Sequence, residues 1–113
     1  MITIWHNPRC SKSRQVLALL EDRDEEVQVR RYLDDVPSIE ELRLTRDTLG
    51  LRTIEMMRTG ESVFRDLGLS ESTDDEGLLK AMATTPKLIE RPVVFANGQA
   101  RIGRPPQAVL EIL

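Results

Sequence analysis

The chain has 113 residues, which suits one domain whose hydrophobic core needs no disulfide or metal ion. A formal net charge of −3 argues against a general nucleic-acid binder, and no apolar run reaches the length of a membrane span. The first residues lack the basic start of a signal peptide. One cysteine cannot form an internal disulfide, and one cysteine with one histidine is too few for structural zinc. We therefore expect a cytoplasmic protein with no metal ion and no membrane or nucleic-acid partner.

The N-terminal third of the sequence predicts a strand, a helix and a second strand. Residues 2–5 are typical of a short strand, and apolar residues at helical spacing predict a helix from about Ser11 to Asp22. Residues 27–33 alternate between apolar and polar and predict the second strand. Because a helix connects the two strands, we expect them to be parallel.

The middle of the chain predicts a series of helices. Ser38 and Glu41 fit a capping box, in which each side chain binds the other residue's free backbone N–H, and Gly50 is expected to end that helix. Thr73 and Glu76 fit a second capping box for a later helix. Further breaks are expected at Gly60, Gly68 and Pro86.

The C-terminal part predicts a hairpin and a last helix. Residues 93–95 and 100–102 are expected to pair as antiparallel strands, because Asn97-Gly98 between them favours a two-residue turn. Pro105 is expected to start the helix. Periodicity alone predicts an α/β fold with a mixed sheet, and the whole order matches a thioredoxin-like, four-stranded sheet flanked by helices. We expect one domain over residues 1–113, with a helical insertion at about 38–86 between the βαβ and ββα halves.

Cys10 is the candidate nucleophile. It lies where the first strand gives way to the first helix, and free N–H groups with a partial positive charge at a helix start favour a thiolate. The basic residues Arg9, Lys12 and Arg14 act in the same direction. The alternative is an inert cysteine in the core, but the polar and basic flanks favour the reactive interpretation.

Two polar residues near Cys10 are candidates for supporting it. Ser13 completes a Cys-x-x-Ser pattern, and its hydroxyl either donates to the thiolate or caps the first turn of the helix. His6 either tunes the thiolate as a cation, accepts its proton when neutral, or is an ordinary loop histidine. Ser13 cannot resolve a disulfide, so an external thiol has to release any oxidised Cys10.

Three arginines stand in patterns that suit an anion site. Arg91 precedes Pro92, which keeps its backbone extended and its side chain directed. Arg58 and Arg104 lie in Arg-Thr-Gly and Gly-Arg-Pro-Pro segments. Guanidinium groups bind oxyanions through paired N–H donors. A single arginine is ordinarily a solvated surface charge, and spacing alone leaves open whether these three converge.

Residues 6–14, His-Asn-Pro-Arg-Cys-Ser-Lys-Ser-Arg, resemble the active-site segment of the glutaredoxin-linked arsenate reductase family. The similarity continues through Tyr32-Leu33, Arg58, residues 90–94 and residues 102–106. It is greatest to a short, uncharacterised branch of that family, whose members end near the last helix as this chain does.

The resemblance implies roles for the residues that match. Cys10 would attack arsenate and form a covalent adduct, while Arg58, Arg91 and Arg104 would bind the oxyanion. Glutathione would attack the adduct, glutaredoxin would remove glutathione from Cys10, and arsenite would be released. No bound cofactor is implied, because glutathione is an external reductant. His6 and Ser13 would be catalytic residues that support the thiolate, and Asn7, Arg14 and Pro92 would be supporting positions.

Two other functions remain open on the sequence. A monothiol oxidoreductase acting on glutathionylated proteins would need Cys10 but not the three arginines. A non-enzymatic partner-binding module on the same fold would tolerate the loss of Cys10. The single cysteine and the matched arginines favour reduction of arsenate or a similar oxyanion.

Overall fold

The computed structural model describes residues 1–113, which form two compact units. Residues 1–35 and 91–113 make up the first unit, and residues 36–90 make up the second. The second unit encloses the segment expected as a helical insertion. None of the helices is long and apolar enough to cross a membrane.

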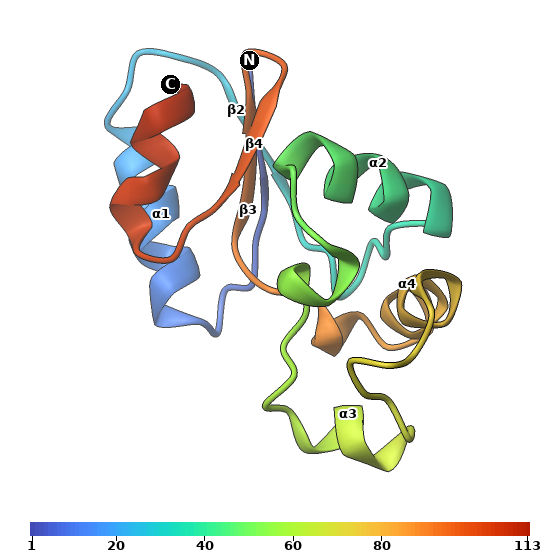
Figure 1. Ribbon diagram of the computed structural model, residues 1–113. Coiled ribbons are helices and arrows are strands. Elements are labelled where there is room, and N and C mark those ends of the chain that lie inside the picture. Colours follow the sequence, from blue (N-terminus) through green and yellow to red (C-terminus); the bar gives the residue numbers. More distant parts are fainter. The chain divides into compact units, whose positions relative to one another are not determined.

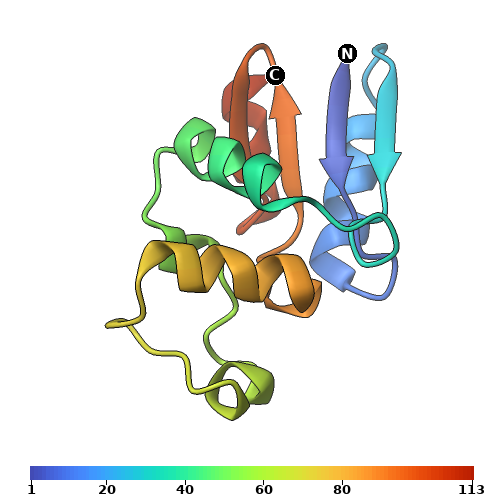
Figure 2. The same cartoon turned by 90° about the vertical axis from the view of Figure 1, so that its right-hand side faces the viewer.

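The first unit is built on a four-stranded sheet in the order β2-β1-β3-β4 (Figure 2). β1 runs parallel to β2 and antiparallel to β3, and β3 runs antiparallel to β4. The expected mixed four-stranded α/β sheet is therefore confirmed. The strands are β1 (Ile2–Trp5), β2 (Val27–Arg30), β3 (Val93–Ala96) and β4 (Gln99–Ile102).

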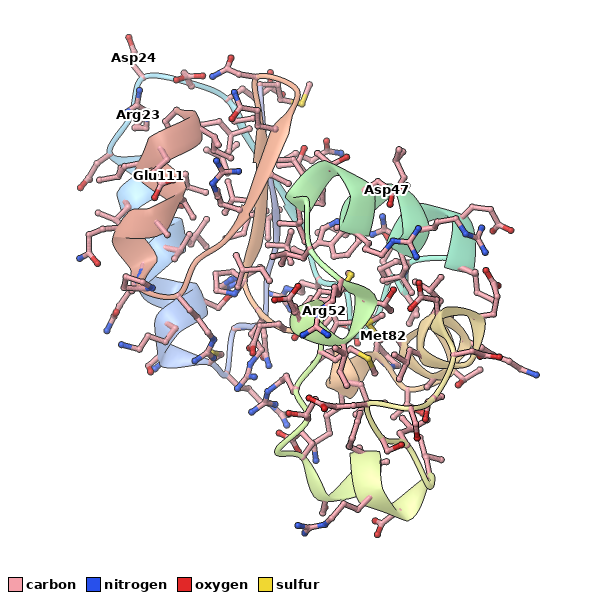
Figure 3. The ribbon with its side chains drawn as sticks, viewed as in Figure 1. Arg23, Asp24, Asp47, Arg52, Met82 and Glu111 are labelled. Carbon is pink, nitrogen blue, oxygen red and sulfur yellow. The ribbon has the colours of Figure 1, made fainter.

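Two helices, α1 (Ser11–Glu21) and η3 (Pro106–Ile112), cover one face of this sheet side by side (Figure 1). Their apolar residues and those of the strands exclude water from a single core, which stabilises the unit. Glu111 lies on η3 and pairs with Arg101 of β4, while Arg23 and Asp24 lie in the loop after α1 (Figure 3). The buried core consists of Ile2, Ile4, Val16, Leu20, Val94, Ala96, Val109 and Ile112.

Four expected boundaries shift in the first unit. β2 ends at Arg30 rather than at residue 33, because the chain turns there and the Arg31 carbonyl accepts hydrogen bonds from the backbone N–H groups of Asp34 and Asp35. The last helix is a 3-10 helix that starts at Pro106, with Pro105 as its N-cap. β3 ends one residue later than expected, and β4 starts one residue earlier. Asn97 and Gly98 between them adopt the positive φ angles of 55° and 73° expected for the turn.

The second unit is helical. α4 packs against α2, η1 and η2, and Met82 extends from α4 with its side chain fully buried (Figure 3). The elements are α2 (Ile39–Leu49), η1 (Thr53–Met56), α3 (Ser62–Asp66), α4 (Asp75–Thr84) and η2 (Pro86–Leu88).

One of the two expected capping boxes is confirmed. Ser38 and Glu41 exchange both hydrogen bonds at 3.1 Å, and Gly50 ends α2 at φ 71°. The second box is wrong, because Asp74 caps α4 and accepts a 2.8 Å bond from the Gly77 N–H. Thr73 instead accepts from the N–H of Ser70, and Glu76 pairs with Arg43. An aspartate one residue later caps as well as a threonine, so it displaces the expected pattern.

Candidate functional site

Cys10 lies at the N-cap of α1, where the loop after β1 enters the helix. Its backbone is extended, with φ −95° and ψ 123°, and its N–H donates to the Asn7 carbonyl at 3.0 Å. The residue is buried, with 8% of its surface exposed. The expected position at the junction of strand and helix is confirmed.

The surroundings of Cys10 lower the pKa of its thiol. Burial is the largest single influence and raises the pKa. The backbone N–H of Ser13, the charge of Arg91, the backbone N–H of Lys12 and the charge of Arg104 lower it, and together they outweigh burial. The site therefore favours the nucleophilic thiolate.

Arg91 and Arg104 reach Cys10 from the sheet. The register pairs Val93 with Ile102, so the two arginines flank equivalent ends of β3 and β4. Arg104 donates from Nε to the Arg91 carbonyl at 2.9 Å, and its Nη2 lies 3.8 Å from Cys10 Sγ. Each arginine precedes a cis proline, Pro92 and Pro105 respectively.

Gly103 allows this end of the sheet to approach α1 closely. A Cβ atom there would lie 2.6 Å from Cγ2 of Val16 and 2.9 Å from Cγ of Pro92. The Gly103 N–H also donates to the Pro92 carbonyl at 2.9 Å. Gly103 was not assigned a role from the sequence. A glycine directly after a strand, as Gly103 follows Ile102, often marks a site where another part of the chain approaches closely.

His6 and Ser13 form a buried pair under the Cys10 loop. Ser13 Oγ lies 2.7 Å from Nδ1 of His6 and accepts a 3.0 Å bond from the Asn7 N–H. The serine hydroxyl therefore orders the loop, and it is the Ser13 backbone N–H that acts on the Cys10 thiolate.

The surroundings of His6 favour its neutral imidazole. Burial lowers the pKa of His6 most, and the charges of Arg31 and Arg14 lower it further, against a smaller opposite effect of Glu21. A neutral ring bonded to Ser13 fits a positioning residue better than a cation that tunes the thiolate. Arg31 was not among the residues singled out from the sequence.

Two further side chains, one from α1 and one from the loop, fix the backbone before Cys10. Arg14 donates from Nη1 to the Pro8 carbonyl at 2.9 Å, and the Asn7 side chain accepts from the Arg9 N–H at 3.0 Å. Both contacts hold the loop in one shape, which orients the groups around the sulfur.

Arg58 belongs to the second unit. Its N–H donates to the Leu88 carbonyl at 2.8 Å, and its guanidinium pairs with Glu61, which Lys87 also approaches at 3.4 Å. The structure therefore brings Cys10, Arg91 and Arg104 together in the first unit, and it gives Arg58 a carboxylate partner within the second. Convergence of all three arginines on one anion stays a prediction.

The model of the ArsC family matches residues 5–112, which include the Cys10 loop and all three arginines. The chain belongs to the ArsC family. The family assignment made from residues 6–14 is thus confirmed. No group of three or more His, Cys, Asp or Glu side chains is placed to hold a metal ion.

Several ArsC relatives match along almost the whole chain. It is 45% identical to an arsenate reductase of Neisseria meningitidis serogroup A, over 99% of this chain and 97% of that protein. It is 46% identical to the uncharacterized protein YfgD of Escherichia coli K12, over 99% of this chain and 96% of that protein. The structure of an arsenate reductase from Vibrio cholerae is 52% identical, covers 99% of this chain and 97% of that one, and superimposes with a TM-score of 0.96. The thioredoxin-like fold shared with ArsC arsenate reductases is therefore confirmed.

Proposed function

We propose that this ArsC-family protein reduces arsenate to arsenite in the cytoplasm, with Cys10 as the nucleophile. The observation that carries the proposal is the Cys10 thiol, whose pKa is lowered and whose sulfur lies 3.8 Å from the Arg104 guanidinium. The relatives named arsenate reductases, at 45% and 52% identity, support the same activity.

The first step joins Cys10 to arsenic. The Cys10 thiolate attacks arsenate, a sulfur–arsenic bond forms, and one arsenate oxygen leaves as water after taking up protons. Arg91 and Arg104 bind the remaining oxygens through charge-assisted hydrogen bonds and offset the negative charge of the attacking sulfur. The family resemblance assigns Arg58 to the oxyanion as well; within the second unit its guanidinium pairs with Glu61.

The second step reduces arsenic and requires an external thiol, because the chain has a single cysteine. The thiolate of glutathione attacks the sulfur of Cys10, the sulfur–arsenic bond breaks, and its electron pair stays on arsenic, which leaves as arsenite. Cys10 is then a mixed disulfide with glutathione. Glutaredoxin attacks the glutathione sulfur and returns Cys10 as a thiolate.

A coupled assay with arsenate, glutathione, glutaredoxin, glutathione reductase and NADPH tests the proposal. We expect NADPH consumption that depends on arsenate and disappears in Cys10→Ser. Arg104→Gln and Arg58→Gln should each raise the KM for arsenate about tenfold or more, because each removes a charged hydrogen-bond donor. The matched controls are Arg101→Gln on β4, which removes the pair with Glu111, and Arg52→Gln, which removes the pair with Glu55.

Absence of arsenate-dependent turnover in an enzyme whose Cys10 still reacts rapidly with an alkylating reagent would overturn the arsenate assignment. Turnover of a glutathionylated peptide by the same preparation, unaffected by Arg58→Gln and Arg104→Gln, would then point to a monothiol oxidoreductase.

A further inference from the structure

The first unit contains a cavity beside the loop that leads into Cys10. Its volume is about 300 Å³, which is at the lower end of the range for small-molecule sites. Residues 6–9 line one side, and Arg31, Leu33 and Asp34, from the turn after β2, line the other. Because Cys10 directly follows the lining loop, a ligand in this cavity binds next to the segment that carries the nucleophile.

The charged side chains that line this cavity have no hydrogen-bonding or ion-pair partner within the protein. The side chains of Arg9, Arg31 and Asp34 make no hydrogen bond or ion pair, and all three residues are exposed. Other arginines of the same unit are engaged, as Arg23 is with Glu25 and Arg101 is with Glu111. The cavity thus presents two unpaired cations and one unpaired anion, and Pro8 and Leu33 add apolar residues to its lining.

We propose that this cavity binds the thiol reductant, a small peptide thiol that carries two carboxylates and one ammonium group, of which glutathione is the representative. The proposal rests on the proposed function, which requires an external thiol at Cys10. Arg9 and Arg31 each bind one carboxylate through paired N–H donors, and Asp34 binds the ammonium.

The location suits the reaction that the bound thiol has to perform. Its sulfur forms a bond to Cys10 Sγ, the sulfur–arsenic bond breaks, and the electron pair of that bond reduces arsenate to arsenite. Arg91 and Arg104 approach the same sulfur from the ends of β3 and β4 rather than from the cavity lining. The oxyanion and the reductant therefore have separate sets of arginines.

The binding test uses S-methylglutathione, which has the charges of glutathione but cannot form a disulfide. Titration of the wild-type protein, followed by NMR, should shift the amide signals of residues 6–9 and 31–34. Arg31→Gln should weaken binding about tenfold, as expected for the loss of a charged hydrogen bond. The control Arg23→Gln, which removes an exposed arginine already paired with Glu25, should bind as the wild type does.

A second ligand identifies the role of Asp34. S-methylglutathione acetylated at its amino group lacks the ammonium and should bind the wild type about tenfold more weakly than the parent compound. Asp34→Asn should bind the two compounds equally. Equal affinity of wild type and Arg31→Gln for S-methylglutathione, or signal shifts confined to residues outside 6–9 and 31–34, would overturn the proposal.

Kinetics separate the reductant site from the oxyanion site. Arg31→Gln should raise the KM for glutathione about tenfold and leave the KM for arsenate at the wild-type value. A raised KM for arsenate instead would assign the cavity to the oxyanion and contradict the proposal. If the enzyme does not turn over arsenate at all, the titration still shows whether the cavity binds S-methylglutathione. Failure of the proposed function and failure of this inference are therefore distinguishable.

Discussion

The guanidinium of Arg104 lies 3.8 Å from the sulfur of Cys10, although the two residues are 94 positions apart in the chain. Arg104 is held in place by its second contact, from Nε to the Arg91 carbonyl at 2.9 Å. One arginine therefore stabilises the thiolate and also connects the end of β4 to the start of β3. The reactivity of Cys10 depends on this contact as well as on the start of α1.

The first prediction concerns the pKa of Cys10. We expect the rate of alkylation by iodoacetamide to follow an apparent pKa below that of free cysteine. Arg104→Gln should raise this pKa, because it removes a positive charge beside the thiolate. Arg101→Gln, within β4 and paired with Glu111, should leave it unchanged. An unshifted pKa in the wild-type protein would contradict the active-site assignment.

The second prediction concerns the buried pair of His6 and Ser13. Ser13→Ala leaves the imidazole Nδ1 and the Asn7 N–H without a partner, which should lower the free energy of unfolding by about 1–3 kcal/mol. Ser11→Ala, at an exposed position of the same helix, should change it by less than about 0.5 kcal/mol. Urea unfolding of the two variants measures the difference. Equal stabilities would show that the serine hydroxyl does not order the loop.

The third prediction concerns the pH dependence of stability. The pKa of His6 is lowered from 6.5 in the folded protein, so below pH 6.5 the unfolded chain binds a proton that the folded state excludes. His6 should therefore cost no stability above pH 6.5 and reduce it progressively as the pH falls towards the folded pKa. Because the chain has one histidine, the difference between the unfolding free energies of wild type and His6→Gln isolates this effect. A pH-independent difference would contradict the lowered pKa.

The sequence predicted the parts of the site that depend on local chemistry. Cys10 at the N-cap, the capping box of Ser38 and the Asn97-Gly98 turn follow from short-range rules, and all three are confirmed. Asp74 displaced Thr73 as a cap because neighbouring residues compete for the same N–H groups. The contact of Arg104 with Cys10 could not be derived from spacing, since it depends on the register of β3 and β4.

The fourth prediction concerns Gly103. Gly103→Ala places a Cβ atom 2.6 Å from Cγ2 of Val16, and this overpacking should lower the free energy of unfolding by about 1–3 kcal/mol. Gly60→Ala is the matched control, because an added Cβ meets nothing within 4 Å there. Thermal unfolding distinguishes the two. Val16→Ala should recover part of the loss in the Gly103→Ala background, and strictly additive effects would contradict a direct clash.

The most direct measurement of the central claim is the intact mass of the protein after incubation with arsenate and reduced glutathione, without glutaredoxin. Cys10 is the single cysteine, so any glutathionyl adduct reports on that sulfur alone. Attack of Cys10 on arsenate predicts one adduct per chain that forms only when arsenate is present, together with release of arsenite. An adduct that forms equally without arsenate, or no adduct on a protein whose Cys10 is reactive, would contradict reduction of arsenate through this cysteine.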